Sequence, residues 1–484
     1  MNASLTTNNL SGAAFAILLL LLATGCSDRF LEVTPKGKLI AKEVSDYDLL
    51  LNNNTLLNTG GANAQLYLGD DVAVVDPYFS ATEPRIQRLF NWLPEVYDPD
   101  QNAAETQSLL SQLYIYNKVI HEVRDAKGGT EAQKNTIRAE AQAGRAWVYF
   151  QLINYFGKPY TELSAATDLG FPIITAADVT ATAFSRASVQ EVYDFIEADL
   201  AAAIPHLPSQ TPYRIRMSRA AGTALLGKVY VFMGRYEEAL PLFDEAMELM
   251  GKATAPTHLV DYNAAFAEGG LYTPADPLFG PNLPTISEDT ETVYARQFSN
   301  FSILSSELVI SSAARSLFDA SDLRLRFFSE TPFPFGSPYP DGLLRRMAPL
   351  TNSYGVALPD IILLRAECRA RTNDLQGALE DLMHLRRHRI PETDAAVPAE
   401  VAANRQLLVP YVFEERTREY AGRGERWFAM RRLSVDPEFG GSSFHHQRYH
   451  EDGTVTEITL PIERLVLKLP AKILLENPGM DDNP

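Results

Sequence analysis

Apolar residues recur every three or four positions along most of the chain, which is the spacing of one face of an α-helix. Capping residues and glycines bound these stretches: Ser188 precedes one of them, and Gly128-Gly129 ends another. A β-like alternation is present only near 454–460. The predicted helices are a short one in 46–57 and longer ones at 104–127, 131–156, 189–200, 219–233, 359–372, 375–389 and 401–433, the last with a break at 422–424.

The hairpin Gly222–Gly251 has the residue spacing of one tetratricopeptide repeat. Gly227 and Ala239 are small enough to let two helix backbones approach closely, while Tyr230 and Phe243 fill the space beside them. Because one such hairpin cannot bury its apolar face alone, we expect at least two more. The predicted fold class is mostly α: a tetratricopeptide-like helical-repeat superhelix with a loop-rich inserted subdomain and little β-structure.

Helical periodicity fades in two stretches. Residues 60–97 are loop-rich and too aromatic for disorder, and long irregular segments in a compact domain are often functional. Residues 253–350 are rich in proline, glycine and aromatic side chains, so we interpret them as an inserted subdomain. Helices return in 359–389 as a degenerate repeat. The expected division is a leader at 1–25, an N-terminal region with helical repeats at 26–252, the insertion at 253–350, and a C-terminal helical region at 351–484.

The leader contains an unbroken apolar run, Ala13–Ala23, followed by Thr24-Gly25-Cys26. Eleven residues are too few to span a bilayer, which takes about twenty. A run of this length before small residues is typical of an export signal, and a cysteine directly after glycine is what a bacterial lipoprotein signal requires. We predict that Cys26 is the lipidation site. An ordinary cleaved signal or a short anchor stays as the alternative, because residues 2–12 contain no lysine or arginine.

Charge and cysteine content narrow the partners. The formal net charge of −18 argues against a nucleic-acid partner and favours neutral or mixed-charge ligands. Apart from Cys26 the only cysteine is Cys368, which lies in an apolar helical pattern and is expected to be a buried small hydrophobe. No disulfide framework is expected.

Motifs for catalysis and for metal binding are weak. His445, His446 and His450 are the best metal candidate by composition, but no cysteine or carboxylate pair lies beside them at a recognised ligand spacing. The segment 98–109 begins like a calcium loop and fails at its sixth and twelfth positions. We find no nucleophile elbow, phosphate-binding loop or dinucleotide fingerprint. We therefore predict no metal site and no cofactor, and leave open whether a calcium ion steadies a loop. A glycosidase needs only two carboxylates, so the absence of a motif does not exclude that reaction.

Two groups of residues could bind a ligand or simply stabilise the fold. In 60–97, the flat ring of Trp92 could stack on the apolar face of a sugar while the Asp71 carboxylate holds its hydroxyl groups; anchoring of loops is the alternative. The charged run Glu414–Arg431 is interpreted as helical ion pairs on a solvated or inter-repeat face.

Several stretches together resemble the SusD/RagB family of outer-membrane nutrient-binding lipoproteins, from about residue 26 to the C-terminus. The resemblance rests on the leader and Cys26-Ser27-Asp28 with Phe30-Leu31-Glu32 and Pro35, on Arg138–Ala141, Arg145–Phe150 and Tyr155–Pro159, on Asp322-Leu323-Arg324, on Ile362–Glu367, on Glu415-Arg416, Gly424–Phe428 and Arg431, and on Asn477-Pro478-Gly479.

The resemblance implies a binding protein and not an enzyme, anchored in the outer membrane by a lipid on Cys26 and facing the cell surface. Such a protein would capture oligosaccharides and deliver them to a TonB-dependent outer-membrane transporter, which its repeat helices would face. The irregular insertion would form the ligand side. Asp71 and Trp92 lie where a carboxylate and an aromatic ring recur in glycan-binding relatives. A peptide-binding member of the same family, a helical-repeat scaffold that binds only proteins, and a secreted glycoside hydrolase stay as alternatives.

Overall fold

The structure is a computed structural model that describes residues 41–253, 257–286 and 288–484. The predicted signal peptide, Cys26 and the stretch up to residue 40 lie outside these residues. In the described part, no helix is both long enough and apolar enough to cross a bilayer.

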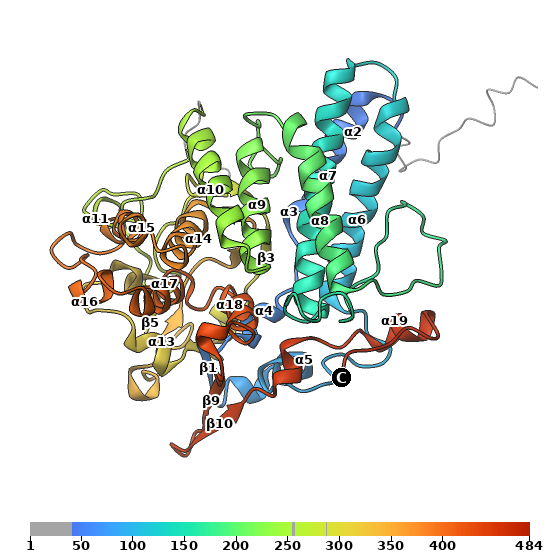
Figure 1. The fold of residues 1–484 in the computed structure, drawn as a ribbon. Coiled ribbons are helices and arrows are strands. Elements are labelled where there is room, and N and C mark those ends of the chain that lie inside the picture. The colour runs from blue at the N-terminus through green and yellow to red at the C-terminus, as the bar shows by residue number, and fades with distance from the viewer. Residues whose placement is uncertain (1–40, 254–256, 287) are drawn as a thin grey trace, which may run out of the picture.

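Paired helices make up most of the molecule (Figure 1). The N-terminal set is α6 (Ala104–Glu122), α7 (Glu131–Phe156), α8 (Val189–Ala203), α9 (Arg219–Phe232) and α10 (Tyr236–Gly251). The C-terminal set is α14 (Leu358–Arg371), α15 (Leu375–Arg387), α16 (Ala399–Ala402), α17 (Arg405–Tyr420) and α18 (Arg426–Leu433). The mostly helical fold is thus confirmed, including the break between α17 and α18.

Local sequence signals set several helix starts. Thr130 and Gln133 form a capping box at α7, in which each side chain accepts a hydrogen bond from the other residue's backbone N–H. Ser188 caps α8 in the same way with Glu191. These reciprocal bonds satisfy N–H groups that have no partner inside the helix, and they explain why the predicted starts of α7 and α8 are correct.

The α9–α10 hairpin is packed as the repeat spacing predicts. Ala239 and Phe243 are fully buried, and a Cβ at Gly227 would lie 2.9 Å from Phe243 Cε1, so this position requires glycine. Gly234 connects the helices with φ of 77°, in the left-handed region. Tyr230 is only half-buried and donates a hydrogen bond to Glu197 on α8. The hairpin contacts α8 and α14 and is therefore part of a larger repeat array.

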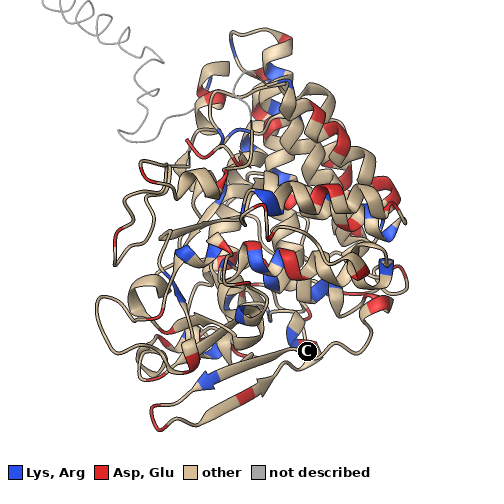
Figure 2. Ribbon diagram, turned by 90° about the vertical axis from the view of Figure 1, so that its left-hand side faces the viewer, with Lys and Arg blue, Asp and Glu red and all other residues tan. Residues whose placement is uncertain are grey.

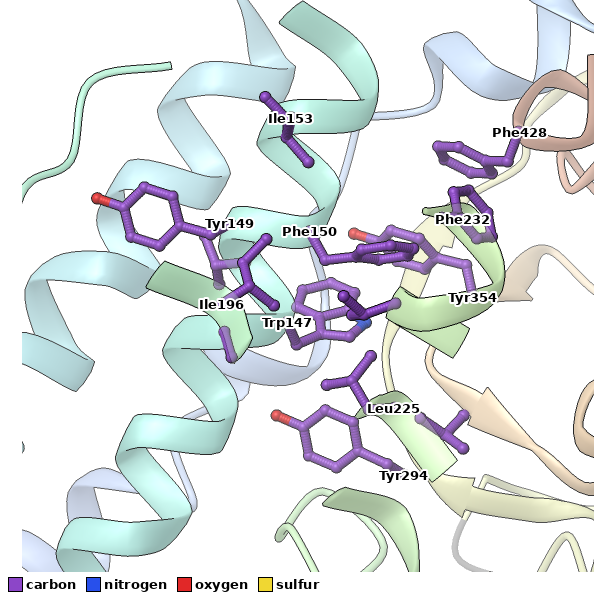
Figure 3. Packing of buried hydrophobic residues seen from close by; sticks show 14 of the residues in the cluster. Trp147, Tyr149, Phe150, Ile153, Ile196, Leu225, Phe232, Tyr294, Tyr354 and Phe428 are labelled. Carbon is purple, nitrogen blue, oxygen red and sulfur yellow. The ribbon is translucent and has the colours of Figure 1, made fainter. Parts of the chain in front are cut away.

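The core joins the repeat helices to the rest of the chain (Figure 3). The ring of Trp147 on α7 meets that of Tyr354 edge-on, with centroids 5.2 Å apart, and Phe150 meets Phe232 of α9 at 4.8 Å. Tyr294 also contacts Trp147 edge-on, at 6.4 Å. Residues outside the repeats thus complete the same apolar core, which binds the irregular segments to the helices.

Short elements lie between the helix sets. Before α6 come α2 (Val44–Leu50), α3 (Asn54–Leu57), α4 (Ala64–Leu68) and α5 (Pro84–Phe90), so the single helix predicted in 46–57 is two. Region 253–350 contains α11 (Tyr262–Ala265), α12 (Ser302–Ser305) and α13 (Ser312–Ser316). Three two-stranded ladders pair β2 (Thr292–Tyr294) with β8 (Val356–Ala357), β3 (Gln297–Ser299) with β7 (Thr351–Ser353), and β5 (Phe328–Ser329) with β6 (Arg345–Arg346).

A four-stranded sheet in the order β10-β9-β1-β4 brings distant parts of the chain together. It consists of β1 (Val72–Val75), β4 (Leu308–Ile310), β9 (His445–Tyr449) and β10 (Val455–Thr459). β1 runs parallel to β9 and antiparallel to β4. The β9–β10 hairpin projects at the end of the molecule away from the upright helices (Figure 1). Of these four strands the sequence predicts only β10. The division of the chain into domains stays a prediction.

The charged run on α17 is buried rather than solvated. Glu415 forms ion pairs with Arg324 at 2.8 Å, with Arg386 of α15 at 2.7 Å and with Arg418 at 2.8 Å. One turn later Glu419 pairs with Arg389 at 2.9 Å and with Arg324 at 3.2 Å. Acidic and basic residues are interleaved along the helices in this view of the molecule (Figure 2). These pairs connect α17 to α15 and to the insertion.

Loss of the Glu415 charge should destabilise the fold strongly. In Glu415→Gln the buried guanidinium groups lose their shared carboxylate, so we expect the free energy of unfolding at pH 7 to fall by about 3–5 kcal/mol. Urea unfolding followed by tryptophan fluorescence measures this. The matched control is Glu414→Gln, whose side chain is 44% exposed and pairs with Arg418 at 3.5 Å; it should cost less than about 1 kcal/mol.

The same variant has a defined pH dependence. Burial alone would raise the pKa of Glu415, but Arg324, Arg418 and Arg386 lower it from 4.5 to about 2. The stabilisation is therefore present above pH 4.5 and is lost as pH falls towards 2, so the deficit of Glu415→Gln should shrink in acid. A deficit no larger than that of Glu414→Gln at pH 7 would contradict the role of this network.

Candidate functional site

The candidate site lies at the edge of the four-stranded sheet where β1 and β9 end. Because these strands are parallel, Asp76 after β1 and His450 after β9 lie at the same edge. β4 runs the opposite way, so Ser306 and Glu307 before it reach this edge as well. Backbone hydrogen bonds from Asp76 to Tyr449 and from Val75 to Glu307 hold the loops in place.

Asp76 is the centre of a polar cluster at this edge. Its carboxylate accepts hydrogen bonds from Ser80 Oγ at 2.7 Å and from Arg448 Nε at 2.9 Å, and it lies 3.1 Å from His450 Nδ1. Partial burial would raise the pKa of Asp76, but the bonds from Arg448 and Ser80 outweigh burial and lower it. The other ring nitrogen of His450 is 2.8 Å from Thr456 Oγ1 on β10. The carboxylate is thus ionised and holds Arg448 and His450 in position.

Aromatic rings gather on the loops around this cluster. The rings of Tyr78 and Tyr339 meet edge-on with centroids 6.4 Å apart, and Tyr339 donates a hydrogen bond to the Ser306 carbonyl at 2.8 Å. The Phe333 backbone N–H donates to Ser306 Oγ at 2.7 Å. A Cβ on Gly336 would lie 3.5 Å from Tyr78 Oη, so the 331–338 loop passes beside Tyr78.

Three further rings on these loops are exposed to solvent. Phe335 is 80% exposed, Phe301 62% and Phe279 48%, and Phe279 lies 5.3 Å from Phe333 between ring centroids. Exposed aromatic side chains of this size on adjoining loops are typical of a binding surface. We define the aromatic rim as Tyr78, Phe279, Phe301, Phe333, Phe335 and Tyr339. Flat apolar rings beside fixed polar groups are suited to a ligand with apolar faces and many hydroxyl groups, such as a sugar.

Trp92 is buried against His446 of β9. Its side chain is 3% exposed, its ring stacks on His446 at 3.8 Å, and its indole N–H donates to the Leu68 carbonyl at 3.2 Å. Phe90 stacks on the other face of His446 at 4.1 Å. The ring nitrogens of Trp92 and His446 all face backbone carbonyl oxygens. A ligand role for Trp92 stays a prediction.

Asp71 lies directly before β1 in the wall of a cleft of about 380 Å³, which Phe413, Thr417 and Arg426 also line. The Gly422 N–H donates to Asp71 Oδ2 at 2.9 Å. Arg426 pairs instead with the neighbouring Asp70, at 2.5 Å. Burial raises the pKa of Asp71 from 3.8 to about 7, more than the Gly422 bond and Arg426 lower it. The cleft is separate from the aromatic rim, and a ligand role for Asp71 stays a prediction.

The three histidines of the metal candidate point apart. Both ring nitrogens of His446 face backbone carbonyls, of Phe90 at 2.7 Å and of Gly69 at 2.8 Å, whereas His445 lies 3.4 Å from Glu457 and His450 faces Asp76. Within the described residues no three histidine, cysteine, aspartate or glutamate side chains are placed to hold a metal ion. Cys368 is buried, as expected.

The rim could be found only in part from the sequence. Asp76 and Tyr78 lie in the aromatic stretch 60–97, and the other rings lie in 253–350, the two segments singled out for losing helical period. No spacing indicated that these segments meet, because β1 and β4 are separated by more than 230 residues and pair over only three positions.

Asp71 should make stability depend on pH. Because its folded pKa is raised to about 7, the folded state loses stability as pH rises from 4 through 7. Asp71→Asn removes this loss and keeps an acceptor for the Gly422 N–H. We expect the free energy of unfolding of the variant, relative to the unsubstituted protein, to increase from pH 5 to pH 8 in urea titrations. Parallel pH profiles would show that the carboxylate is not in a low-dielectric position.

Comparisons with known proteins agree with this architecture. A family model described as "Starch-binding associating with outer membrane" matches residues 29–231, and the model of the SusD family matches residues 358–473. The SusD-like protein P2 of Formosa agariphila is 32% identical over 110 residues, 22% of this chain. That match spans 20% of the relative's own length.

Solved structures are similar over nearly the whole chain. A SusD superfamily protein from Bacteroides thetaiotaomicron has a TM-score of 0.70 at 19% identity, covering 91% of this chain and 100% of that one. A SusD-like carbohydrate binding protein from Bacteroides vulgatus has a TM-score of 0.65 at 17% identity, covering 91% and 97%. The two family models and the relative define the class: the chain belongs to the SusD/RagB family. The solved structures show the same fold.

Proposed function

We propose that this protein is a cell-surface lipoprotein that captures oligosaccharides at the aromatic rim and delivers them to a TonB-dependent outer-membrane transporter. The observation that carries the proposal is the set of exposed rings at one sheet edge, beside hydrogen-bonding groups held by Asp76. Family membership supports it, since one matching model is described by starch binding and outer-membrane association. A similar structure is described as carbohydrate binding.

Capture needs no covalent step. The exposed faces of Phe335 and Tyr78 would stack on the apolar faces of pyranose rings. Ser80, Arg448 and His450 would hydrogen-bond the hydroxyl groups at the rim of the sugar, already oriented by Asp76 so that little side-chain entropy is lost on binding. Binding through several weak contacts permits release to a partner. The repeat helices, on the far side of the molecule from the β9–β10 hairpin, would be free to face that partner (Figure 1).

Removal of one exposed ring should weaken capture without affecting the fold. In Phe335→Ala we expect oligosaccharide binding to weaken about threefold to tenfold, the value of one aromatic stacking contact. Isothermal titration with a ligand first found on a glycan array measures it. The control is Leu163→Ala, a fully exposed apolar residue in the 157–170 segment after α7. Equal affinity in both variants would remove Phe335 from the site.

An array that carries both glycans and peptides also separates the alternatives. Binding of peptides and of no glycan would assign the chain to the peptide-binding members of the family. Binding of neither ligand class, with no transporter co-purifying, would leave a protein-binding scaffold and overturn the proposal. Release of shorter sugars from a bound oligosaccharide would indicate a hydrolase.

Lipid anchoring rests on Cys26. In Cys26→Ala the acceptor thiol is absent, so we expect the protein to move from the membrane fraction to the soluble fraction when it is expressed with its own leader. Cell fractionation with immunoblotting measures the distribution. Cys368→Ser, which changes the other cysteine, should leave it unchanged. Retention of Cys26→Ala in the membrane fraction would show that another feature anchors the chain.

A further inference from the structure

We infer that the aromatic rim selects uncharged oligosaccharides and rejects those that carry carboxylate or sulfate groups. This inference rests on the proposed function and adds the class of ligand to it. It follows from the charges that the described residues place on the rim loops and from the partners that those charges already have.

The cations near the rim are already bound to protein groups. Arg448 donates to Asp76 and to Ser80, and its guanidinium lies over the Phe79 ring. Arg345, beneath Phe333, is 1% exposed and donates to the backbone carbonyls of Thr331 and Ile303. Recognition of a carboxylate or a sulfate usually requires a guanidinium or ammonium group with free N–H bonds directed at the anion. The charge of Arg448 is already balanced by Asp76 at 2.9 Å, and Arg345 is buried, so neither arginine offers an unbalanced positive charge.

Lysine cannot take this role, because residues 253–350 contain none. The same region has six arginines against eleven aspartates and glutamates. Three of the arginines, Arg296, Arg324 and Arg345, are at most 3% exposed. The insertion therefore presents mainly negative charge to solvent.

Exposed carboxylates surround the rings. Glu330 and Asp341 lie at the two ends of the loop that carries Phe335, and Asp276 accepts hydrogen bonds from the backbone N–H groups of Leu278 and Phe279. Those bonds lower the pKa of Asp276 and keep it ionised next to the exposed Phe279 ring. Asp276 lies three residues before Phe279 and Asp341 two residues after Tyr339, so an anionic sugar seated on the rings would be repelled by these carboxylates.

The hairpin beside the rim adds to this field. Its turn carries Glu451 and Asp452, both exposed, and Glu457 lies on β10. The Thr454 side chain and backbone N–H donate to Asp452 and lower its pKa. The groups that remain to meet a ligand are Ser80, His450, the charge-balanced Arg448–Asp76 pair and the π-faces of the rings. These match the hydroxyl groups and apolar faces of uncharged sugars.

A matched pair of ligands tests the inference. Oligogalacturonate with its carboxylates fully methyl-esterified and the same oligomer after de-esterification share one backbone and differ in charge; neutral agarose oligosaccharides and sulfated carrageenan oligosaccharides form a second pair. On the chain lacking residues 1–26, we expect the charged member of any pair that binds to be at least about tenfold weaker at 0.15 M salt, because like charges meet at the rim. The ratio should shrink at 0.5 M salt.

Variants locate the effect. The double variant Glu330→Gln, Asp341→Asn removes two exposed charges and leaves the core unchanged. It should reduce the ratio of the affinities for the neutral and the charged member of a pair. Asp76→Asn frees Arg448 and His450 and should raise binding of the charged member; circular dichroism checks that it is folded. Tighter binding of charged than of neutral glycans would overturn the inference and leave glycan capture intact. Absence of binding to every glycan, neutral or charged, would overturn the proposed function and the inference with it.

Discussion

Two carboxylates on α17 determine how residues 253–350 fit against the C-terminal helices. Glu415 and Glu419 of α17 neutralise Arg324 from residues 253–350, Arg386 of α15 and Arg389 just after α15, all nearly excluded from solvent. An isolated buried guanidinium costs several kcal/mol, so none of these segments can be buried without the others. Residues 253–350, which carry five of the six rim rings, are therefore held on the helices by charge pairing as well as by apolar packing.

The helical frame and the aromatic rim are stabilised by different interactions. The repeat helices depend on close packing, with Gly227 against Phe243 and the rings around Trp147 filling the core. The rim depends on hydrogen bonds that fix loops, such as those from Tyr339 and Phe333 to Ser306, which leave other rings free to solvent. A rigid frame that carries loops with exposed side chains is the usual way to vary a binding surface while the fold stays constant. Structural similarity at 19% identity is consistent with that division.

The four-stranded sheet is small, yet it decides where the candidate site lies. It places the end of β1, the start of β4 and the β9–β10 hairpin at one edge, from three parts of the chain. Asp76 then balances the charge of Arg448 and orients His450 across this edge, so the site presents no unbalanced guanidinium to an anionic ligand. The charge preference of the rim thus follows from strand pairing and not from composition alone.

Local sequence determined the helices. The capping box of Thr130 and Gln133 and the turn at Gly234 depend only on residues close to them in the sequence. The start of α7 and the α9–α10 turn could therefore be predicted. Tertiary structure alone decided the environment of isolated polar and aromatic residues. The sequence left open whether Trp92 binds a ligand or anchors a loop, and His446, 354 positions away, covers its ring. It also left open whether the charges of α17 face solvent or another repeat, and arginines from other segments surround them. Periodicity reports only a residue's near neighbours, whereas burial depends on which distant segments pack against it.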